Sequence, residues 1–195
     1  MSEADVFCKV PVGQVVEVLC ALPEDAFSDV DHVRELLLAN PVDPASLAPF
    51  LCWDRQHYTR NLIEKTPIFE LLAICWEVGQ ASAIHNHRDQ NCWMAAGAGR
   101  LMVQNYRVIS KDVAAHRCLL EPTDLIELNA RRPCAVDPRE PVHSVFNPKE
   151  LGERAVSLHV YSRPFDSCEV YSVEQGIYGD IQLSYTTVKG TPVAK

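Results

Sequence analysis

The residues best suited to chemistry are His85 and His87, which are separated by one residue in an apolar stretch between Gly79 and Gly99. Side chains two residues apart on a β-strand point to the same face, so both imidazoles can enter one cavity. Neutral imidazoles bind Fe, Zn, Cu or Ni. The alternative is a pair of hydrogen-bonded interior histidines, which we would favour for one His alone. Two at this spacing favour a metal site.

A mononuclear site needs a third protein ligand, and His143 is the best candidate. It begins a His-x3-Asn pattern that ends at Asn147 and follows a proline turn. His32 and His57 belong to the expected helical region or its border, and His116 is on a candidate strand without a motif. Three imidazoles leave coordination positions on the metal for a substrate and O2. Non-haem iron oxygenases use the same open arrangement with two His and one carboxylate, and here a third His would replace the carboxylate.

Short β-like runs separated by turn residues begin at Ile68 and provide the framework for these side chains. Their spacing, with Gly and Pro between them, is typical of a barrel or sandwich. The candidate strands are Ile68–Glu77, Cys92–Ala96, Leu101–Val108, Ala114–Leu119, Asp124–Leu128, Val142–Phe146, Ala155–Tyr161, Glu169–Ser172 and Ile181–Thr187.

The region 12–50 has a different character and is predicted to be helical. Ser28, Asp29 or Asp31 can cap a helix through Val33–Ala39. We therefore expect an N-terminal helical lobe in front of the strands.

No linker rich in Gly or Ser separates the two regions, so residues 1–195 are expected to form one domain. In this interpretation residues 53–187 form the metal-binding barrel. Residues 188–195 are expected to be a loose tail.

Composition limits the partners. The net charge of -8 disfavours nucleic acids and anionic membranes as partners. No apolar run reaches the length of a membrane span, and the acidic start of the chain does not look like a signal peptide. The eight cysteines are scattered without a Cys-x-x-Cys pair, which favours reduced thiols over a disulfide framework or a zinc site. We expect a cytoplasmic monomer.

Several motifs together resemble a known family. The pattern Gly-x5-His-x-His-x4-Cys92-x6-Gly resembles the first cupin motif, with Cys92 where most metal-binding cupins have Glu, and the His-x3-Asn pattern resembles the second. With the segments 58–62, 72–76 and 156–168, the chain resembles cysteine dioxygenase from about residue 53 to 171. The resemblance implies a mainly β, jelly-roll-like cupin barrel with a small N-terminal helical lobe.

The same resemblance implies an activity. Members of the family hold Fe(II) with three histidines, which match His85, His87 and His143. Their substrates are L-cysteine and O2, and their product is cysteine sulfinic acid, an oxidation level that is irreversible for most thiols.

The resemblance also implies residues that bind the substrate. Arg60 matches the anchor of the substrate carboxylate, because a guanidinium pairs with a carboxylate through two hydrogen bonds. Tyr58 is expected to bond near the same carboxylate. Trp76 and Cys168 match positions near the pocket, although core packing explains both equally well.

Four more residues match positions beside the metal. Cys92 and Tyr161 match the pair that forms a thioether crosslink in animal members, which locks the phenol in place. On a strand, Ser157, His159 and Tyr161 face the same side and can form a hydrogen-bonded row that orients the phenol. We assign His159 a tuning role and not a ligand role.

One departure is Arg163, which replaces the first proline of the animal Ser-Pro-Pro-Phe-Asp and makes a cis peptide there improbable. Dioxygenases for other small thiols such as 3-mercaptopropionate typically have Gln and Gly in place of Arg60 and Cys92, so cysteine is favoured. The alternatives are such a relative, or a non-catalytic metal-binding cupin or thiol sensor.

Overall fold

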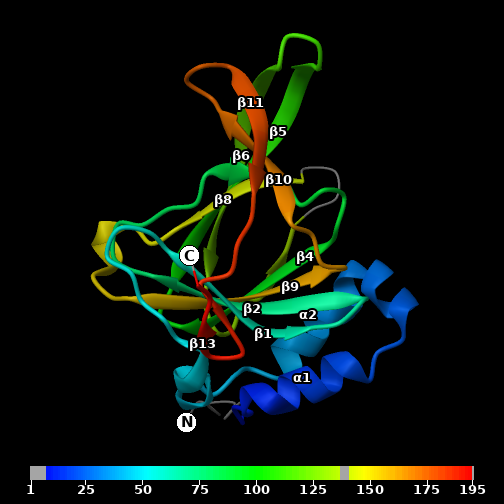
Figure 1. Cartoon of the computed structure of the whole chain (residues 1–195), viewed down its shortest axis with the longest axis vertical. Helices are drawn as coiled ribbons and strands as arrows, with labels where there is room; N and C mark the ends of the chain where they lie inside the picture. Colours follow the sequence, from blue (N-terminus) through cyan, green and yellow to red (C-terminus); the bar gives the residue numbers. More distant parts are fainter. Residues whose placement is uncertain (1–7, 137–140, 195) are drawn as a thin grey trace, which may run out of the picture.

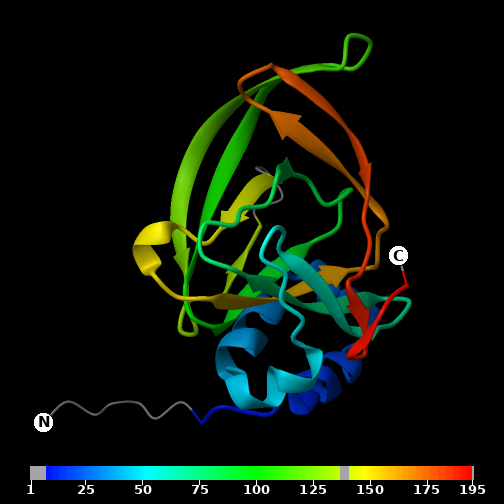
Figure 2. The ribbon, with the colours of Figure 1, turned by 60° about the vertical axis from the view of Figure 1, so that its left-hand side comes forward.

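Helices form the first part of the chain in the computed structural model, which describes residues 8–136 and 141–194. They are α1 (Val12–Cys20), η1 (Glu24–Ser28), α2 (Val30–Ala39) and η2 (Pro44–Phe50). Asp29 is the cap of α2, because its carboxylate accepts hydrogen bonds from the backbone N–H groups of Asp31 and His32, each at 3.1 Å. Figure 2 shows the helices packed together beneath the sheet.

The strands of the described chain form two sheets, one of them a closed barrel (Figure 1). The first sheet has the order β13-β12-β1-β2-β9-β4-β7, and the barrel the order β10-β11-β6-β5-β8-β3. The bounds are β1 (Thr59–Lys65), β2 (Phe69–Trp76), β3 (Ile84–His85), β4 (Cys92–Ala98), β5 (Leu101–Asp112), β6 (Arg117–Leu128), β7 (Cys134–Ala135), β8 (Val142–Phe146), β9 (Ala155–Ser162), β10 (Ser167–Ser172), β11 (Ile177–Gln182), β12 (Thr187–Val188) and β13 (Thr191–Pro192), with a 3-10 turn η3 (Lys149–Leu151) before β9.

Strand β2 is buried along its whole length because both of its faces are covered. Its residues alternate between two apolar clusters: Leu71 and Ala73 pack with the helices, whereas Leu72, Ile74 and Trp76 pack inside the barrel. A strand covered on both faces reads as a continuous apolar run. The helices therefore cover one face of this sheet, and its other face packs against strands of the barrel.

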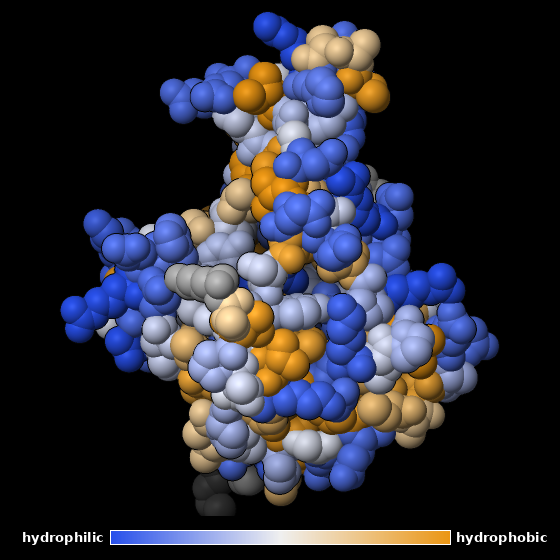
Figure 3. Space-filling model, viewed as in Figure 1, coloured by the Kyte–Doolittle hydropathy of each residue, from blue (hydrophilic) through white to orange (hydrophobic). Residues whose placement is uncertain are grey.

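The hairpin β5–β6 projects beyond the rest of the molecule (Figure 1). The sequence predicted two strands, Ala114–Leu119 and Asp124–Leu128, where β6 is one, because Pro122 interrupts the run. Pro122 is accommodated where the pairing register shifts between Gln104 and Tyr106, and a β-bulge tolerates a residue without an N–H. Exposed Val113 and Leu119 lie near its tip, where Figure 3 shows apolar residues.

Strand β1 and the end of the chain differ from the prediction. The residues of β1 were not among the candidate strands. The tail expected to be loose from residue 188 is instead paired in part: β12 lies parallel to β1, β13 pairs with β12, and the Lys189 N–H donates to the Leu62 carbonyl at 2.8 Å. Backbone pairing, which composition does not reveal, holds this segment.

The prediction of a mainly β chain with a barrel and a small N-terminal helical lobe is confirmed, and the barrel is accompanied by a seven-stranded sheet. Within the described residues, no helix is both long enough and apolar enough to span a membrane.

Candidate metal centre

Three histidines converge inside the barrel. His85 ends the short strand β3 and lies directly opposite His143 of β8, and His87 follows two residues later. The ring centroids are 4.8 Å apart for His85–His143 and His87–His143, and 5.1 Å for His85–His87. One ring nitrogen of each lies within 4.8 Å of the others. The structure brings together the three residues that the sequence predicted as metal ligands, and the set can hold one metal ion.

Hydrogen bonding supports this interpretation. The ring nitrogens of the buried His87 and His143 have no hydrogen-bond partner. Nδ1 of His85 lies 2.9 Å from the carbonyl oxygen of Ala83, which leaves Nε2 for another use. Buried polar atoms are almost always paired, and each orphan costs about 1–3 kcal/mol. A bound cation would satisfy these nitrogens, so the residues fit a metal.

The three histidines are also in the right charge state. Burial lowers the pKa of His85 to about 4, and it lowers the pKa values of His87 and His143 well below the usual value. The rings are therefore neutral at physiological pH, and a neutral imidazole has the lone pair that a metal needs.

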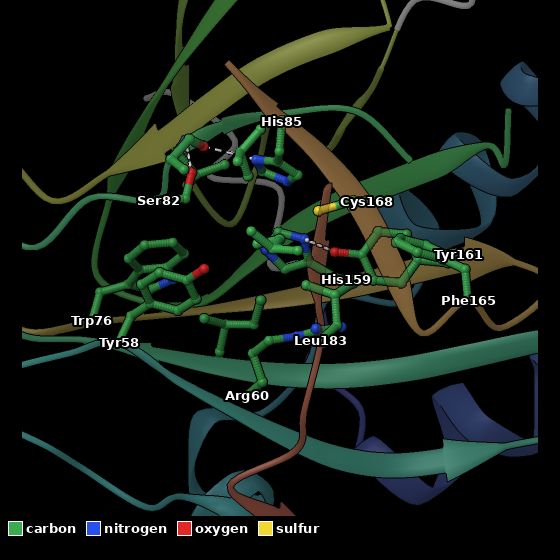
Figure 4. A pocket seen from close by; sticks show the side chains of 15 residues that line it. Tyr58, Arg60, Trp76, Ser82, His85, His159, Tyr161, Phe165, Cys168 and Leu183 are labelled. Carbon is green, nitrogen blue, oxygen red and sulfur yellow. Dashed lines mark hydrogen bonds between the residues drawn. The ribbon is translucent and has the colours of Figure 1, made fainter. Parts of the chain in front are cut away.

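A small cavity of about 490 Å³, including its mouth, opens beside His85 (Figure 4). Arg60 of β1 and His85 lie on opposite sides of it. Tyr58 and Trp76 stack on one wall with ring centroids 4.6 Å apart, and Cys168 of β10 also faces the cavity. The structure thus brings together the four residues that the sequence predicted for substrate binding.

The backbone of Arg60 is held in place, and one nitrogen of its guanidinium is without a partner. Its N–H donates to the hydroxyl of Thr186 at 3.2 Å, and its carbonyl accepts from the Thr186 N–H at 2.7 Å. The buried nitrogen Nη1 has no hydrogen-bond partner. A half-buried guanidinium with such a nitrogen is suited to receive an anionic group.

A hydrogen-bonded row crosses the floor of the site, as predicted for Ser157, His159 and Tyr161. The indole N–H of Trp76 donates to Ser157 Oγ at 2.9 Å, Ser157 Oγ lies 2.8 Å from His159 Nε2, and His159 Nδ1 lies 3.2 Å from the Tyr161 hydroxyl. An indole can only donate, so Ser157 Oγ accepts from Trp76 and its own hydrogen is available for Nε2. We assign this tautomer, in which Nδ1–H donates to Tyr161 and Tyr161 keeps its own hydrogen for a group in the cavity.

Acid should destabilise the metal-free protein through His159. Burial lowers its pKa to about 3 from an ordinary value of 6.5. Between these values the unfolded chain takes up a proton that the folded protein does not, so stability falls with falling pH by about 1 kcal/mol per unit. His159→Gln removes this titration. Unfolding by urea is measured at several values between about pH 7 and pH 5. As the pH falls, the free energy of unfolding of His159→Gln should decrease less steeply than that of the unaltered protein, by about 1 kcal/mol per pH unit. Equal slopes in the two proteins would contradict the prediction.

Cys92 and Tyr161 face one another across the pairing of β4 with β9. Both side chains are buried, and burial raises the pKa of each well above its usual value, so thiol and phenol stay protonated in the absence of a metal. The register places the two residues opposite one another on neighbouring strands.

Other cavity residues were missed from the sequence. Ile181 and Leu183 approach from the C-terminal segment, and Phe165 packs edge-on against Tyr161 with centroids 4.9 Å apart. Phe165 lies within a motif that carried the resemblance and could have been included. Ile181 and Leu183 alternate with a polar residue, but nothing in the sequence says which face meets the cavity.

Arg163 shapes the loop after Tyr161. No peptide bond among the described residues is cis, as expected there, and Arg163 instead has a left-handed φ of 68°. Its guanidinium pairs with Glu24 at 2.5 Å, which ties the loop to the helical lobe.

Comparison with known proteins identifies the family. Residues 1–174 match the family described as cysteine dioxygenase type I. Relatives named cysteine dioxygenase type 1 include those of Bos taurus (28% identical, covering 95% of this chain and 90% of the relative), Mus musculus (29%, 80% and 76%) and Danio rerio (24%, 97% and 93%). A Klebsiella pneumoniae structure with a double-stranded β-helix domain has a TM-score of 0.47 at 14% identity, covering 70% of this chain and 88% of that one, which is too distant to inform function. Because the family match spans most of the chain, this protein belongs to the cysteine dioxygenase type I family.

Proposed function

We propose that this protein is an Fe(II)-dependent dioxygenase that converts L-cysteine and O2 into cysteine sulfinic acid. Both oxygen atoms add to sulfur, so one thiol and one O2 give one sulfinic acid with no other reductant. The observation that carries the proposal is a buried guanidinium nitrogen of Arg60 without a partner, on a cavity that opens beside the cluster of three neutral histidines, in a chain of this family.

Fe(II) would be held by His85, His87 and His143. Bound iron supplies the one-electron chemistry by which O2 reacts with a thiolate. Imidazoles also accept Zn or Ni, so the choice of iron rests on the family and not on the ligand set.

The protein's own groups position the substrate. Arg60 receives the carboxylate through its planar fork, with the Tyr58 hydroxyl near the same group. Because Arg60 and His85 lie on opposite sides of the cavity, a molecule with a carboxylate at one end and a thiol at the other spans it. Cysteamine has no carboxylate and would leave the guanidinium unpaired, at a cost of a few kcal/mol.

Tyr161 provides a hydrogen-bond donor next to the reacting sulfur. His159 Nδ1–H satisfies one lone pair of the phenol oxygen, so the Tyr161 hydroxyl hydrogen is directed to another acceptor. Because the phenol stays protonated, this donor is present throughout the physiological pH range. His159 and Ser157 fix its direction and so act as positioning residues.

We expect a thioether between Cys92 Sγ and the Tyr161 ring to form during turnover, each residue losing one hydrogen atom with O2 as the oxidant. After incubation with Fe(II), L-cysteine and air, the intact mass should fall by the mass of two hydrogen atoms. Cys92→Ser should show no such change and about 10-fold lower activity, because the phenol is less well held. An identical mass shift in Cys92→Ser would contradict this pairing.

The cytoplasm is the compartment we propose. All eight cysteines are free thiols, a state that reducing compartments maintain.

The decisive experiment is O2 consumption by Fe(II)-loaded protein with L-cysteine, with sulfinate measured by mass spectrometry. 3-Mercaptopropionate and cysteamine serve as comparison substrates. One O2 consumed per cysteine sulfinate, with cysteine preferred, supports the proposal. No turnover of any thiol at full iron occupancy would show a metal-binding protein instead.

A further inference from the structure

Asn86 separates the two ligands of the His-x-His pair, and its contacts link it to the neighbouring strand β10. The Asn86 backbone N–H donates to the Glu169 carbonyl at 3.1 Å, and the Glu169 N–H donates to Asn86 Oδ1 at 3.0 Å. Asn86 Nδ2 donates to the Glu169 carboxylate at 2.8 Å. Three hydrogen bonds therefore join the residue between the two ligands to residue 169.

The Glu169 carboxylate is itself held by two more side chains. Lys111 Nζ lies 2.8 Å from both of its oxygens, and the Tyr171 hydroxyl donates to it at 2.6 Å. Burial would raise the pKa of Glu169, but these hydrogen bonds and the Lys111 charge lower it below its usual value. Lys111 belongs to β5 of the projecting hairpin and also lies 4.3 Å from the centroid of the Tyr178 ring. The carboxylate is thus an ionised centre shared by β5, β10 and the ligand segment.

The ligand segment needs such support because its own backbone has little. Strand β3 has only two residues and ends at His85, so His87 lies outside any strand. The two residues after His87, Arg88 and Asp89, have left-handed φ values of 52° and 63°, which non-glycine residues rarely adopt. The position of His87 is therefore set mainly by its neighbours.

We infer that Glu169, fixed by Lys111 and Tyr171, is a positioning residue for the three-histidine site and acts through Asn86. The hairpin β5–β6 then contributes to metal affinity through Lys111, although it lies outside the cavity. The inference rests on the metal site of the proposed function, but not on its substrate. Residues that orient metal ligands from outside the first set of contacts typically change metal affinity by about 10- to 100-fold when removed.

Metal binding without turnover tests this directly. Co(II) is titrated into the metal-free protein, and both the dissociation constant and the Co(II) d–d absorption, which reports coordination geometry, are measured. Glu169→Ala should weaken Co(II) binding by about 10- to 100-fold and alter the d–d spectrum. Glu169→Gln keeps an oxygen for Asn86 and should recover part of the affinity. Lys111→Met should weaken binding by less than Glu169→Ala.

A matched control is Lys189→Met, which removes a lysine bonded to Glu64 at 2.9 Å on an exposed surface away from the histidines. Its affinity and spectrum should equal those of the unaltered protein. If Glu169→Ala does not fold, the Co(II) affinity and spectrum of Lys111→Met, a change at an exposed residue, test the inference. Unchanged affinity and spectrum in the folded variants, or an equal loss in Lys189→Met, would overturn the inference. Failure of the unaltered protein to oxidise cysteine while it binds Co(II) would refute only the proposed function.

Discussion

Replacing His87 with alanine is expected to abolish tight metal binding and sulfinate formation. His87 is only 2% exposed, and neither of its ring nitrogens has a hydrogen-bond partner in the protein, so a bound ion would satisfy a nitrogen that is otherwise unpaired. Removing a direct ligand should weaken metal binding by more than the roughly 100-fold that removal of a supporting residue causes. The measurements are iron content after anaerobic loading and dialysis, and the rate of sulfinate formation.

The matched control is His32→Ala, on the exposed surface of α2, where alanine is a good helix former. It should bind iron and turn over like the unaltered protein. Circular dichroism establishes that both variants are folded. Full iron content and activity in a folded His87→Ala protein would rule out the site formed by these three histidines.

The row from Ser157 to Tyr161 could be predicted because it lies on the regular strand β9, whose two-residue period places alternate side chains on one face. His85 and His87 were found by their spacing, although the strand expected to carry both ends at His85. Strand β8 has the predicted bounds, Val142–Phe146, because it is a short apolar run that follows a proline.

Strand β1 shows where pattern reasoning fails. Thr59 and Asn61 are polar and resemble loop residues, yet both are buried. Their polar groups are satisfied internally: Asn61 Nδ2 donates to Thr59 Oγ1 at 3.0 Å and to the Ala73 carbonyl at 3.1 Å, and Thr187 donates to Asn61 Oδ1 at 3.1 Å. Two of these partners lie on other strands, so the sequence of β1 alone does not contain the reason for its burial.

The same limit applies to the support of the metal site. Lys111 and Glu169 are 58 residues apart, and each alone looks like a solvated surface charge. Only the barrel closure, which brings β10 beside β3, makes them neighbours of the ligand segment. Motifs found Arg60, the three histidines and the row from Ser157 to Tyr161, whereas the residues that hold the ligand segment in place depend on topology.

Replacing Arg60 with glutamine should raise the KM for L-cysteine by about 100-fold with a much smaller change in kcat. The reason is that Arg60 binds a part of the substrate that does not react, and removing one partner of a buried, hydrogen-bonded charge pair costs roughly 3 kcal/mol. Glutamine retains N–H donors, but it has neither the positive charge nor the two parallel N–H groups of the guanidinium. Arg60→Lys should fall between the two, because it keeps the charge without the two parallel bonds.

The comparison substrate makes the result specific. Cysteamine has no carboxylate, so its kcat/KM should change little in Arg60→Gln, and the preference for cysteine over cysteamine should shrink by about the same 100-fold. Steady-state O2 consumption with both thiols measures this ratio. Equal losses with both would mean that the Arg60 side chain supports the shape of the cavity, for example through its position 5.8 Å from the centroid of the Tyr185 ring. A preserved preference for cysteine would place the carboxylate elsewhere, with the Tyr58 hydroxyl as the remaining donor on that wall.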